Sequence, residues 1–255
     1  MVNDYLTIAL SFVMGLAVFA SMPLIFNKKM IKHMLFLNAF AIGILVFLLL
    51  DIYGDVAGVF GNSSITNPLE IIFIVGFALS FLFFIMPKES RDPELSPKRT
   101  SMLAAIGIGF QNLTEGLLFG SAGAAGLVPI YVLSIIGFTL QNMTEGFPIA
   151  APMVGAKQAI EKKFIVGAFI IGGAPTVVGT VIGIFFFSNA FITLFDALAS
   201  AAILYVVFVL FHVNINRGRA LMDGKGVHNF MWTTYAGILL GFVIAYVVNY
   251  TLVIP

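Results

Sequence analysis

The motif Gln-Asn-x-Thr-Glu-Gly occurs twice in the chain, at 111–116 and at 141–146. Each copy lies inside a long apolar run. A glutamate carboxylate in hydrocarbon costs about 3 kcal/mol on insertion scales, so two of them need compensation. No Lys or Arg lies in the interior of any apolar run. The positive charge is therefore expected to come from a proton or a bound cation.

The spacing of the motif places its polar groups on one helix face. Gln111 and Glu115 are four residues apart, so they share a face, and Gln141 and Glu145 repeat this arrangement. A short turn at 121–126 joins the two runs and makes them antiparallel neighbours. The two glutamines then lie at similar depth, within about 5 Å along the helix axes. Two carboxylates and four amide groups suit a hard or borderline divalent cation; the candidate ligands are Gln111, Asn112, Glu115, Gln141, Asn142 and Glu145.

A simpler interpretation is that these groups hold helices together, at about 1 kcal/mol for each interhelical hydrogen bond. Two glutamates without a basic partner weaken it. The same polar motif on two antiparallel helices is instead typical of a transporter binding site formed by inverted repeats. Gly116 and Gly146 indicate close backbone approach beside the site or plain helix packing. Three prolines interrupt the second of these runs and the next one, at Pro148, Pro152 and Pro175. They indicate either broken helices, which line substrate sites in transporters, or the prolines that are common in ordinary membrane helices.

Composition predicts an all-α integral membrane protein. Hydrophobic residues make up 60% of the chain and charged residues 10%, against about 25% charged in soluble domains. A single transmembrane domain of eight helices is expected, with the first run retained as a span and not a signal peptide. The spans fall at about 4–26, 32–53, 68–87, 100–121, 126–153, 163–187, 190–213 and 230–253.

Basic residues orient these spans. All 13 Lys and Arg fall in the loops that follow odd-numbered spans, which the positive-inside rule places in the cytoplasm. Both termini are then extracellular, and a polar linker at 88–99 divides the spans into three, two and three. These residues are Lys28, Lys29, Lys32, Lys88, Arg91, Lys98, Arg99, Lys157, Lys162, Lys163, Arg217, Arg219 and Lys225.

Other polar residues lie near the span ends. The three histidines lie at the cytoplasmic side, where solvated or interfacial residues are expected and an exit-side metal relay is the sharper alternative: His33, His212 and His228. Asp51, Asp55 and Asp196 lie towards the extracellular side. They are either helix-end polar groups or residues that attract cations.

The motifs and topology resemble the ZIP (Zrt/Irt-like) divalent-metal transporters, especially their GufA-like prokaryotic branch. That family has eight spans, external termini, and His-Asn-x-Pro-Glu-Gly or related motifs in spans four and five. The resemblance implies that the six motif residues named above coordinate metal. The chain departs from the family pattern at four positions. Gln111 replaces the family's histidine, Thr114 and Thr144 replace its motif prolines, and Thr176 replaces its span-six glutamate. The family's span-seven carboxylate is also missing. These departures weaken the case for a second, bridging metal ion and for a preference for zinc.

The sequence thus predicts a multi-pass cell-membrane transporter of zinc, iron, manganese or a similar divalent ion, with no organic cofactor. The expected partners are this metal ion and the lipid bilayer. A homodimer is one option for the oligomeric state, and net charge +1 gives no support for nucleic-acid binding. The alternative is a degenerate ZIP-like sensor or assembly subunit without transport. An enzyme is not expected, because no His-Glu-x-x-His or Gly-x-Ser-x-Gly motif is present, and no membrane-embedded lysine exists for a retinal.

The charge segregation makes a direct prediction. Lys98 and Lys163 should react with a membrane-impermeant amine reagent only from the cytoplasmic side, because both lie in loops that the positive-inside rule assigns to the cytoplasm. The measurement is labelling of intact cells against inside-out vesicles, read by mass spectrometry. Labelling of either lysine in intact cells would contradict the eight-span orientation.

Overall fold

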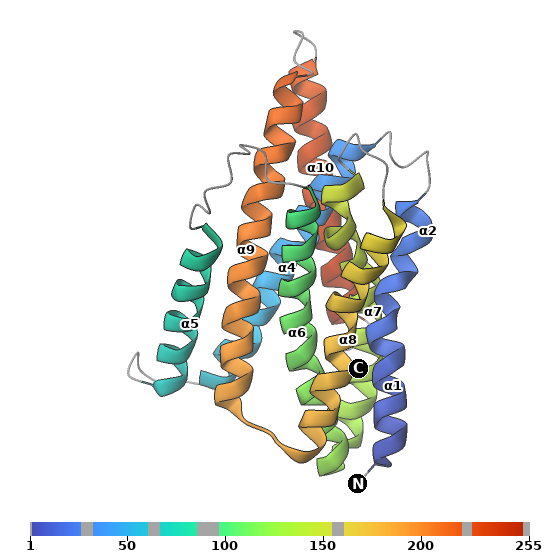
Figure 1. Ribbon diagram of the computed structural model, residues 1–255, viewed down its shortest axis with the longest axis vertical. Coiled ribbons are helices and arrows are strands. Elements are labelled where there is room, and N and C mark those ends of the chain that lie inside the picture. The colour runs from blue at the N-terminus through green and yellow to red at the C-terminus, as the bar shows by residue number, and fades with distance from the viewer. Residues whose placement is uncertain are drawn as a thin grey trace.

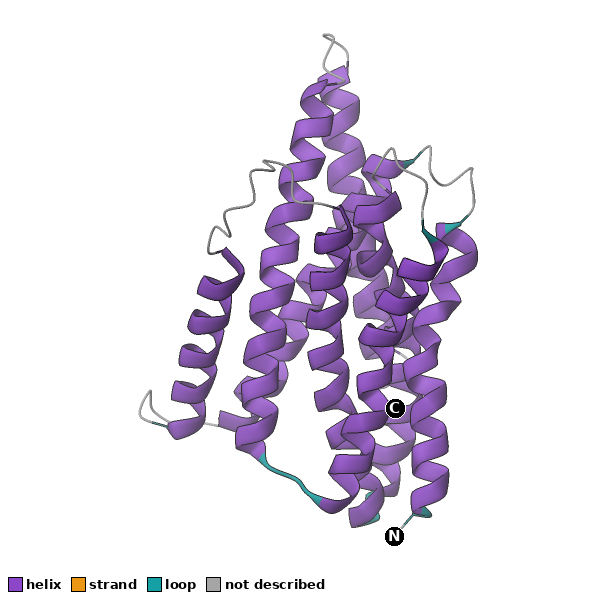
Figure 2. Cartoon of the chain, viewed as in Figure 1, coloured by secondary structure: helices purple, strands orange, loops and turns teal. Residues whose placement is uncertain are grey.

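The structure is a computed structural model that describes residues 2–26, 33–60, 67–85, 97–154, 161–220 and 226–251. Within these residues every regular element is a helix (Figure 2). The elements are α1 (Asp4–Leu16), the 3₁₀ segment η1 (Ala17–Ser21), α2 (Met22–Ile25), α4 (Met34–Phe60), α5 (Pro68–Ile85), α6 (Pro97–Ala125), α7 (Val128–Val154), α8 (Lys162–Phe185), α9 (Asn189–Ala220), α10 (Gly226–Tyr246) and the π segment η2 (Val247–Thr251).

Seven helices in the described residues are long and apolar enough to cross a membrane, as expected of a multi-pass membrane protein. They are Asp4–Ser21, Leu35–Gly58, Pro68–Ile85, Pro97–Ala125, Lys162–Phe185, Asn189–Asn216 and Phe230–Asn249. The predicted fifth span corresponds to α7, which is not among the seven. Its 27 residues would extend about 40 Å, so length is sufficient. Its second polar motif and its prolines lower its hydropathy.

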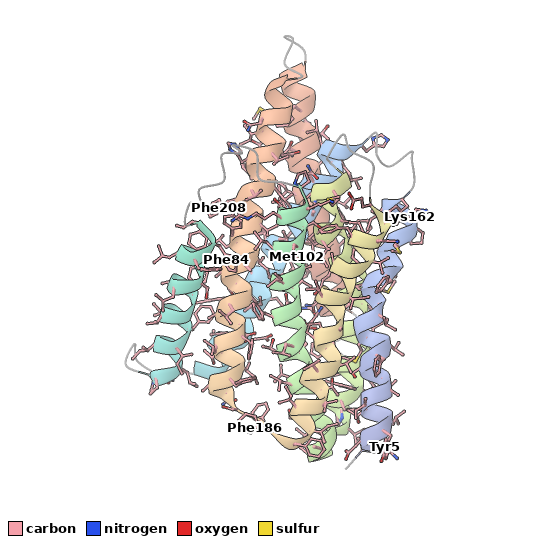
Figure 3. All side chains as sticks on the ribbon, in the orientation of Figure 1. Tyr5, Phe84, Met102, Lys162, Phe186 and Phe208 are labelled. Carbon is pink, nitrogen blue, oxygen red and sulfur yellow. The ribbon has the colours of Figure 1, made fainter. Side chains whose placement is uncertain are left out.

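Consecutive long helices run in opposite directions along the bundle (Figure 1). Lys162 lies at one end and both Tyr5 and Phe186 lie at the other (Figure 3). Lys98 at the start of α6 pairs with Glu161 just before α8, with 2.7 Å between Nζ and Oε1. Several of the basic loop residues lie outside the described residues, namely Lys28, Lys29, Lys32, Lys88, Arg91, Lys157 and Lys225.

Local signals explain where the helices begin and end. The Asn3 side chain caps α1 by accepting from the amides of Tyr5 and Leu6 at 2.9 and 3.2 Å. α6 continues to Ala125, so the turn predicted at 121–126 is shorter than expected. The helix ends where Gly126 adopts a φ of 71°, a conformation that glycine reaches without the Cβ penalty of other residues.

The predicted interruption of helices at proline is wrong. α7 continues through Pro148 and Pro152, and α8 continues through Pro175. Proline removes one backbone hydrogen bond, but neighbouring helices can hold such a helix together in a membrane. The irregular segments lie elsewhere, at η1 and η2, where no proline occurs.

Glycines bring α6 and α8 into backbone contact. A methyl group built on Gly116 would meet the carbonyl oxygen of Thr176, and one on Gly179 would meet that of Leu113. Gly15 of α1 and Gly173 of α8 approach each other in the same way. Small residues permit such approach between membrane helices. α8 is therefore held between α6 and α1.

At the edge of the bundle, α5 packs mainly through aromatic side chains on α9. The ring centroids of Phe84 and Tyr205 are 6.1 Å apart, and those of Phe81 and Phe208 are 6.3 Å apart. Figure 3 shows Phe84 and Phe208 between these two helices. No residue of α5 is fully buried, whereas α6 lies at the centre of the bundle (Figure 1).

The contact between α6 and α8 predicts opposite effects for two glycines of α8. Gly179→Ala should lower the free energy of unfolding by about 1–3 kcal/mol, because the added methyl group meets Leu113 backbone. Gly167→Ala is the matched control: open space surrounds Gly167, so alanine should be neutral or stabilise by up to about 1 kcal/mol. Thermal unfolding of the purified variants in detergent measures both. Equal effects at the two positions would contradict a tight contact.

Candidate functional site

The two motifs meet between α6 and α7. All six predicted ligands are buried, with at most 5% of any side chain exposed. The short connection at Gly126 and Leu127 makes the two helices antiparallel and sets the motifs at a common depth. The structure thus brings together every member of the predicted set: Gln111, Asn112, Glu115, Gln141, Asn142 and Glu145.

Gln141 links the two glutamates. Its Nε2 donates to Oε1 of Glu115 at 2.6 Å across the helix interface, and lies 3.4 Å from Oε1 of Glu145 one turn along α7. Gln111 Nε2 donates to the same Oε1 of Glu115 at 3.2 Å. Hydrogen bonds to an ionised acceptor are stronger than neutral ones. These amide donors therefore orient the carboxylates without neutralising their charge.

Asn112 joins three helices. Its Nδ2 lies 2.7 Å from Oδ1 of Asn142, 2.9 Å from Oε2 of Glu145 and 3.0 Å from the carbonyl oxygen of Gly172. Gly172 lies on α8, so the close approach of α8 to α6 supplies this acceptor. The NH₂ group of Asn112 therefore acts on Glu145 as a donor, and only its Oδ1 could bind a cation.

Three buried oxygens at the site have no hydrogen-bond donor in the part of the chain that the structure describes. They are Oε1 of Gln111, Oδ1 of Asn112 and Oε2 of Glu115, and Nδ2 of Asn142 likewise has no acceptor. A buried acceptor without a partner costs about 1–3 kcal/mol. Three such oxygens from one helix fit the donor set that a hard cation takes. Hydrogen bonds that only hold helices together do not account for these unpaired oxygens.

The site carries two carboxylates and lacks a basic partner among the described residues. Arg99 is the nearest basic residue before the motif along α6, and lies 12 residues before Gln111, about 18 Å along the helix. Glu115 and Glu145 act electrostatically on each other, and Asp51 and Asp55 of α4 act on Glu115. Within the described residues, no group of three or more His, Cys, Asp or Glu side chains is placed to hold a metal ion. Any metal here would therefore depend on the amide oxygens.

The threonines that replace the family's motif prolines and span-six glutamate lie next to the site. The Thr114 and Thr144 hydroxyls donate to the carbonyl oxygens of Gln111 and Gln141, at 2.7 and 2.8 Å. Thr176 packs on Gly116 directly after Glu115, is fully buried, and has a hydroxyl without a partner.

The glycine after the second glutamate has its own contact. Gly146 packs against Val18 and Ser21 of η1, and the Ser21 hydroxyl donates to Val18 O at 2.9 Å. The irregular part of the first span thus lies beside Glu145. Neither this segment nor its contact was evident from the sequence.

The remaining polar residues lie outside the six-residue set. His33 is exposed, and His212, also exposed, lies 2.8 Å from Asn216; the side chain of His228 is outside the described residues. Asp51 accepts from Nδ2 of Asn249 at 2.7 Å. Asn249 belongs to the π segment η2, and no signal in the sequence pointed to it.

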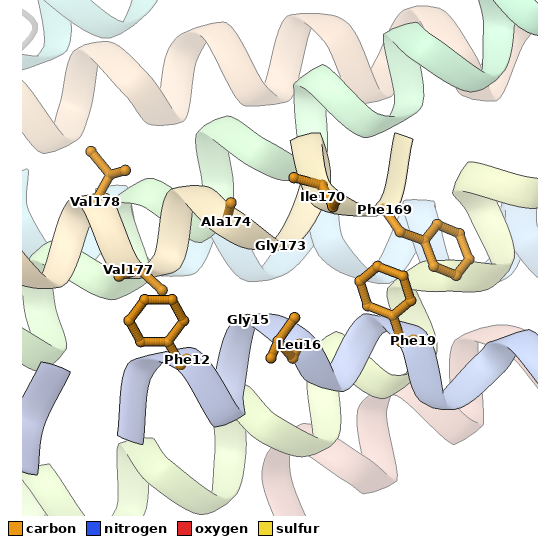
Figure 4. A pocket seen from close by; sticks show the side chains of 10 residues that line it. All are labelled: Phe12, Gly15, Leu16, Phe19, Phe169, Ile170, Gly173, Ala174, Val177 and Val178. Carbon is orange, nitrogen blue, oxygen red and sulfur yellow. The ribbon is translucent and has the colours of Figure 1, made fainter. Parts of the chain in front are cut away.

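A separate groove of about 340 Å³ lies between α1 and α8 (Figure 4). Ten residues line it, and none carries a charge or a polar side chain: Phe12, Gly15, Leu16, Phe19, Phe169, Ile170, Gly173, Ala174, Val177 and Val178. Such a lining offers a cation no ligand. The six candidate ligands lie at the α6–α7 interface, not in this groove.

A search with protein-family models found no match for the chain, and a search of curated proteins found no significant match. The resemblance to ZIP transporters therefore depends on the two motifs, on their placement, and on the number of apolar runs.

Proposed function

We propose that this protein is a ZIP-like transporter that moves a divalent cation across the membrane through a site at the α6–α7 interface. The supporting observation is the combination of two buried carboxylates with three buried oxygens that lack a donor. One divalent ion neutralises two glutamates and supplies a partner for those oxygens. Carboxylate and amide oxygens are ligands for ions such as manganese, iron or zinc, with weaker selectivity than imidazole or thiolate.

In this proposal α7 is an eighth transmembrane helix. It is as long as α4, 27 residues each, and it packs among α6, α4, α1 and η1. Its polar groups face those of α6, so the lipid does not have to accommodate them. Eight spans place both termini on one side, and the basic loops assign that side to the exterior.

The second candidate is a ZIP-like sensor or assembly subunit that binds metal without transporting it. The extensive hydrogen bonding of Asn112 to α7 and α8 supports it, because such contacts also stabilise a static bundle. Uptake of a divalent ion into proteoliposomes distinguishes the two. Binding without uptake would favour the second candidate.

The glutamates provide the main test. Glu115→Gln and Glu145→Gln should each weaken binding of Mn²⁺ or Zn²⁺ by about 100-fold or more, equivalent to about 2.8 kcal/mol. Glutamine keeps one acceptor for the amide donors, so each variant should still fold. Glu70→Gln in the first turn of α5 is the control and should bind like the wild type. Calorimetry on purified protein measures affinity, and circular dichroism checks the fold.

The pH dependence of the same measurement is informative. Protons compete with metal for carboxylates, so affinity should weaken as pH falls and binding should release protons. Unchanged affinity in both glutamine variants would contradict a metal site at the α6–α7 interface.

Gln111 tests the selectivity. A histidine at this position can donate one ring N–H to Glu115, as Gln111 Nε2 does at 3.2 Å, and present the other nitrogen where Oε1 now lacks a partner. Because imidazole favours zinc over manganese, Gln111→His should raise the zinc-to-manganese affinity ratio about tenfold, or about 1.4 kcal/mol. Zinc binding should also fall more steeply below about pH 6.5, where imidazole protonates.

Met143→His is the matched control for this substitution. Met143 lies within the second motif but is 40% exposed, so an imidazole there points away from the site. The ratio should not change in this variant. A ratio that is also unchanged in Gln111→His would mean that Gln111 does not bind the metal directly.

A further inference from the structure

Asp196 is a buried carboxylate outside the six-residue set. It lies on α9, in the second turn, and only 4% of it is exposed. Its carboxylate lies near the Thr114 hydroxyl on α6, whose hydrogen bond goes to Gln111 O at 2.7 Å. Thr114 belongs to the first motif but is not one of the candidate metal ligands. Asp196 is therefore adjacent to the proposed metal site without being part of it.

Hydrogen counting shows that Asp196 lacks a dedicated donor. The Thr114 hydroxyl carries one hydrogen, and Gln111 O lies 2.7 Å from its oxygen. When the Thr114 hydroxyl donates to the Gln111 carbonyl, it has no hydrogen left for Asp196. When it donates to Asp196, the Gln111 carbonyl loses this donor. A second positive group is needed for both acceptors to be satisfied.

Thr193 provides an independent observation. It lies three residues before Asp196, so the two share a face of α9. Thr193 is fully buried, and its Oγ1 has no hydrogen-bond partner among the described residues. A buried oxygen without a partner therefore lies on the same face of α9 as the buried carboxylate. Thr114, Thr193 and Asp196 together offer a small set of oxygen ligands.

The charges that act on Asp196 are acidic. Among the described residues they come from Asp55 and Asp51 of α4. α6 contributes the neutral Thr114, and no charged group of α5 or α10 in the described residues acts on Asp196. A carboxylate within the membrane needs a compensating positive charge, and no described side chain supplies it.

We propose that Asp196, with the hydroxyls of Thr114 and Thr193, binds a monovalent cation, either H⁺ or Na⁺, beside the divalent site. The charge count selects this valence. One carboxylate is neutralised by one positive charge, whereas a divalent ion would leave a net positive charge in the membrane interior. The role of this cation as a coupling ion rests on the proposed transport function. Its binding does not, and is measured without divalent metal.

The experiment uses purified protein in detergent with a chelator present. Sodium is titrated against choline at constant ionic strength while the midpoint of thermal unfolding is followed, since a ligand of the native state raises it. Infrared difference spectra between two pH values, at fixed sodium, report a protonated carboxyl group. The wild type should show either a sodium-dependent rise, which identifies Na⁺, or a carboxyl band insensitive to sodium, which identifies H⁺.

Asp196→Asn should abolish whichever response the wild type shows. Asp4→Asn, at an exposed carboxylate in the first turn of α1, is the control and should retain it. Thr193→Val keeps the carboxylate and should weaken the sodium response, or shift the carboxyl transition, several-fold. This variant replaces Asp196→Asn as the test if Asp196→Asn does not fold. The inference is overturned if the wild type shows neither response, or if the response that the wild type shows survives the loss of Asp196.

These outcomes are separable from those for the divalent site. If manganese binding is absent but the Asp196 response is present, the proposed function fails and the monovalent site stands. If Glu115→Gln loses metal binding while Asp196→Asn changes nothing, the monovalent site fails alone.

Discussion

Two buried glutamates that have no basic partner among the described residues are the constraint on which the rest of this structure depends. An ammonium or guanidinium group would neutralise them permanently and would fix the interface as a structural ion pair. The chain instead surrounds them with amides, which orient a carboxylate and leave its charge unbalanced. In the proposed function, a mobile positive charge balances the two glutamates. An unbalanced charge of this kind is expected of a binding site and is unfavourable for a purely structural contact.

The contact between α6 and α8 follows from this constraint. The Asn112 amide reaches the Gly172 carbonyl at 3.0 Å because glycines let the two backbones approach. Each glycine lowers intrinsic helix stability by about 1 kcal/mol relative to alanine. In a membrane, close packing and interhelical hydrogen bonds offset this cost. The backbone of Thr176 packs on Gly116, the residue after Glu115, so α8 contributes a neutral residue to this contact.

The sequence predicted the helical membrane architecture and the meeting of the motifs, because both depend on local signals. Apolar run length identifies a span, and a short turn forces its neighbours to be antiparallel. The sequence did not predict the 3₁₀ segment beside Gly146, the π segment that carries Asn249, or the unbroken helices at Pro148 and Pro175. These depend on contacts between segments far apart in the chain. Asn249 reaches Asp51 across 198 positions, and no local pattern encodes such a pair.

The charges of the two proposed sites balance as a set. Glu115, Glu145 and Asp196 carry three negative charges when ionised, which one divalent and one monovalent cation neutralise. Thr114 lies between the sites, since its single hydrogen goes either to Gln111 O or towards Asp196. A cation at Asp196 releases that hydrogen to the backbone of α6, immediately beside the Gln111 side chain. Any effect of the monovalent ion on divalent affinity must then be matched by an equal effect in reverse, because coupling between two binding sites is reciprocal. A threonine at this motif position makes that link through its hydroxyl, and a proline would have no hydrogen to share.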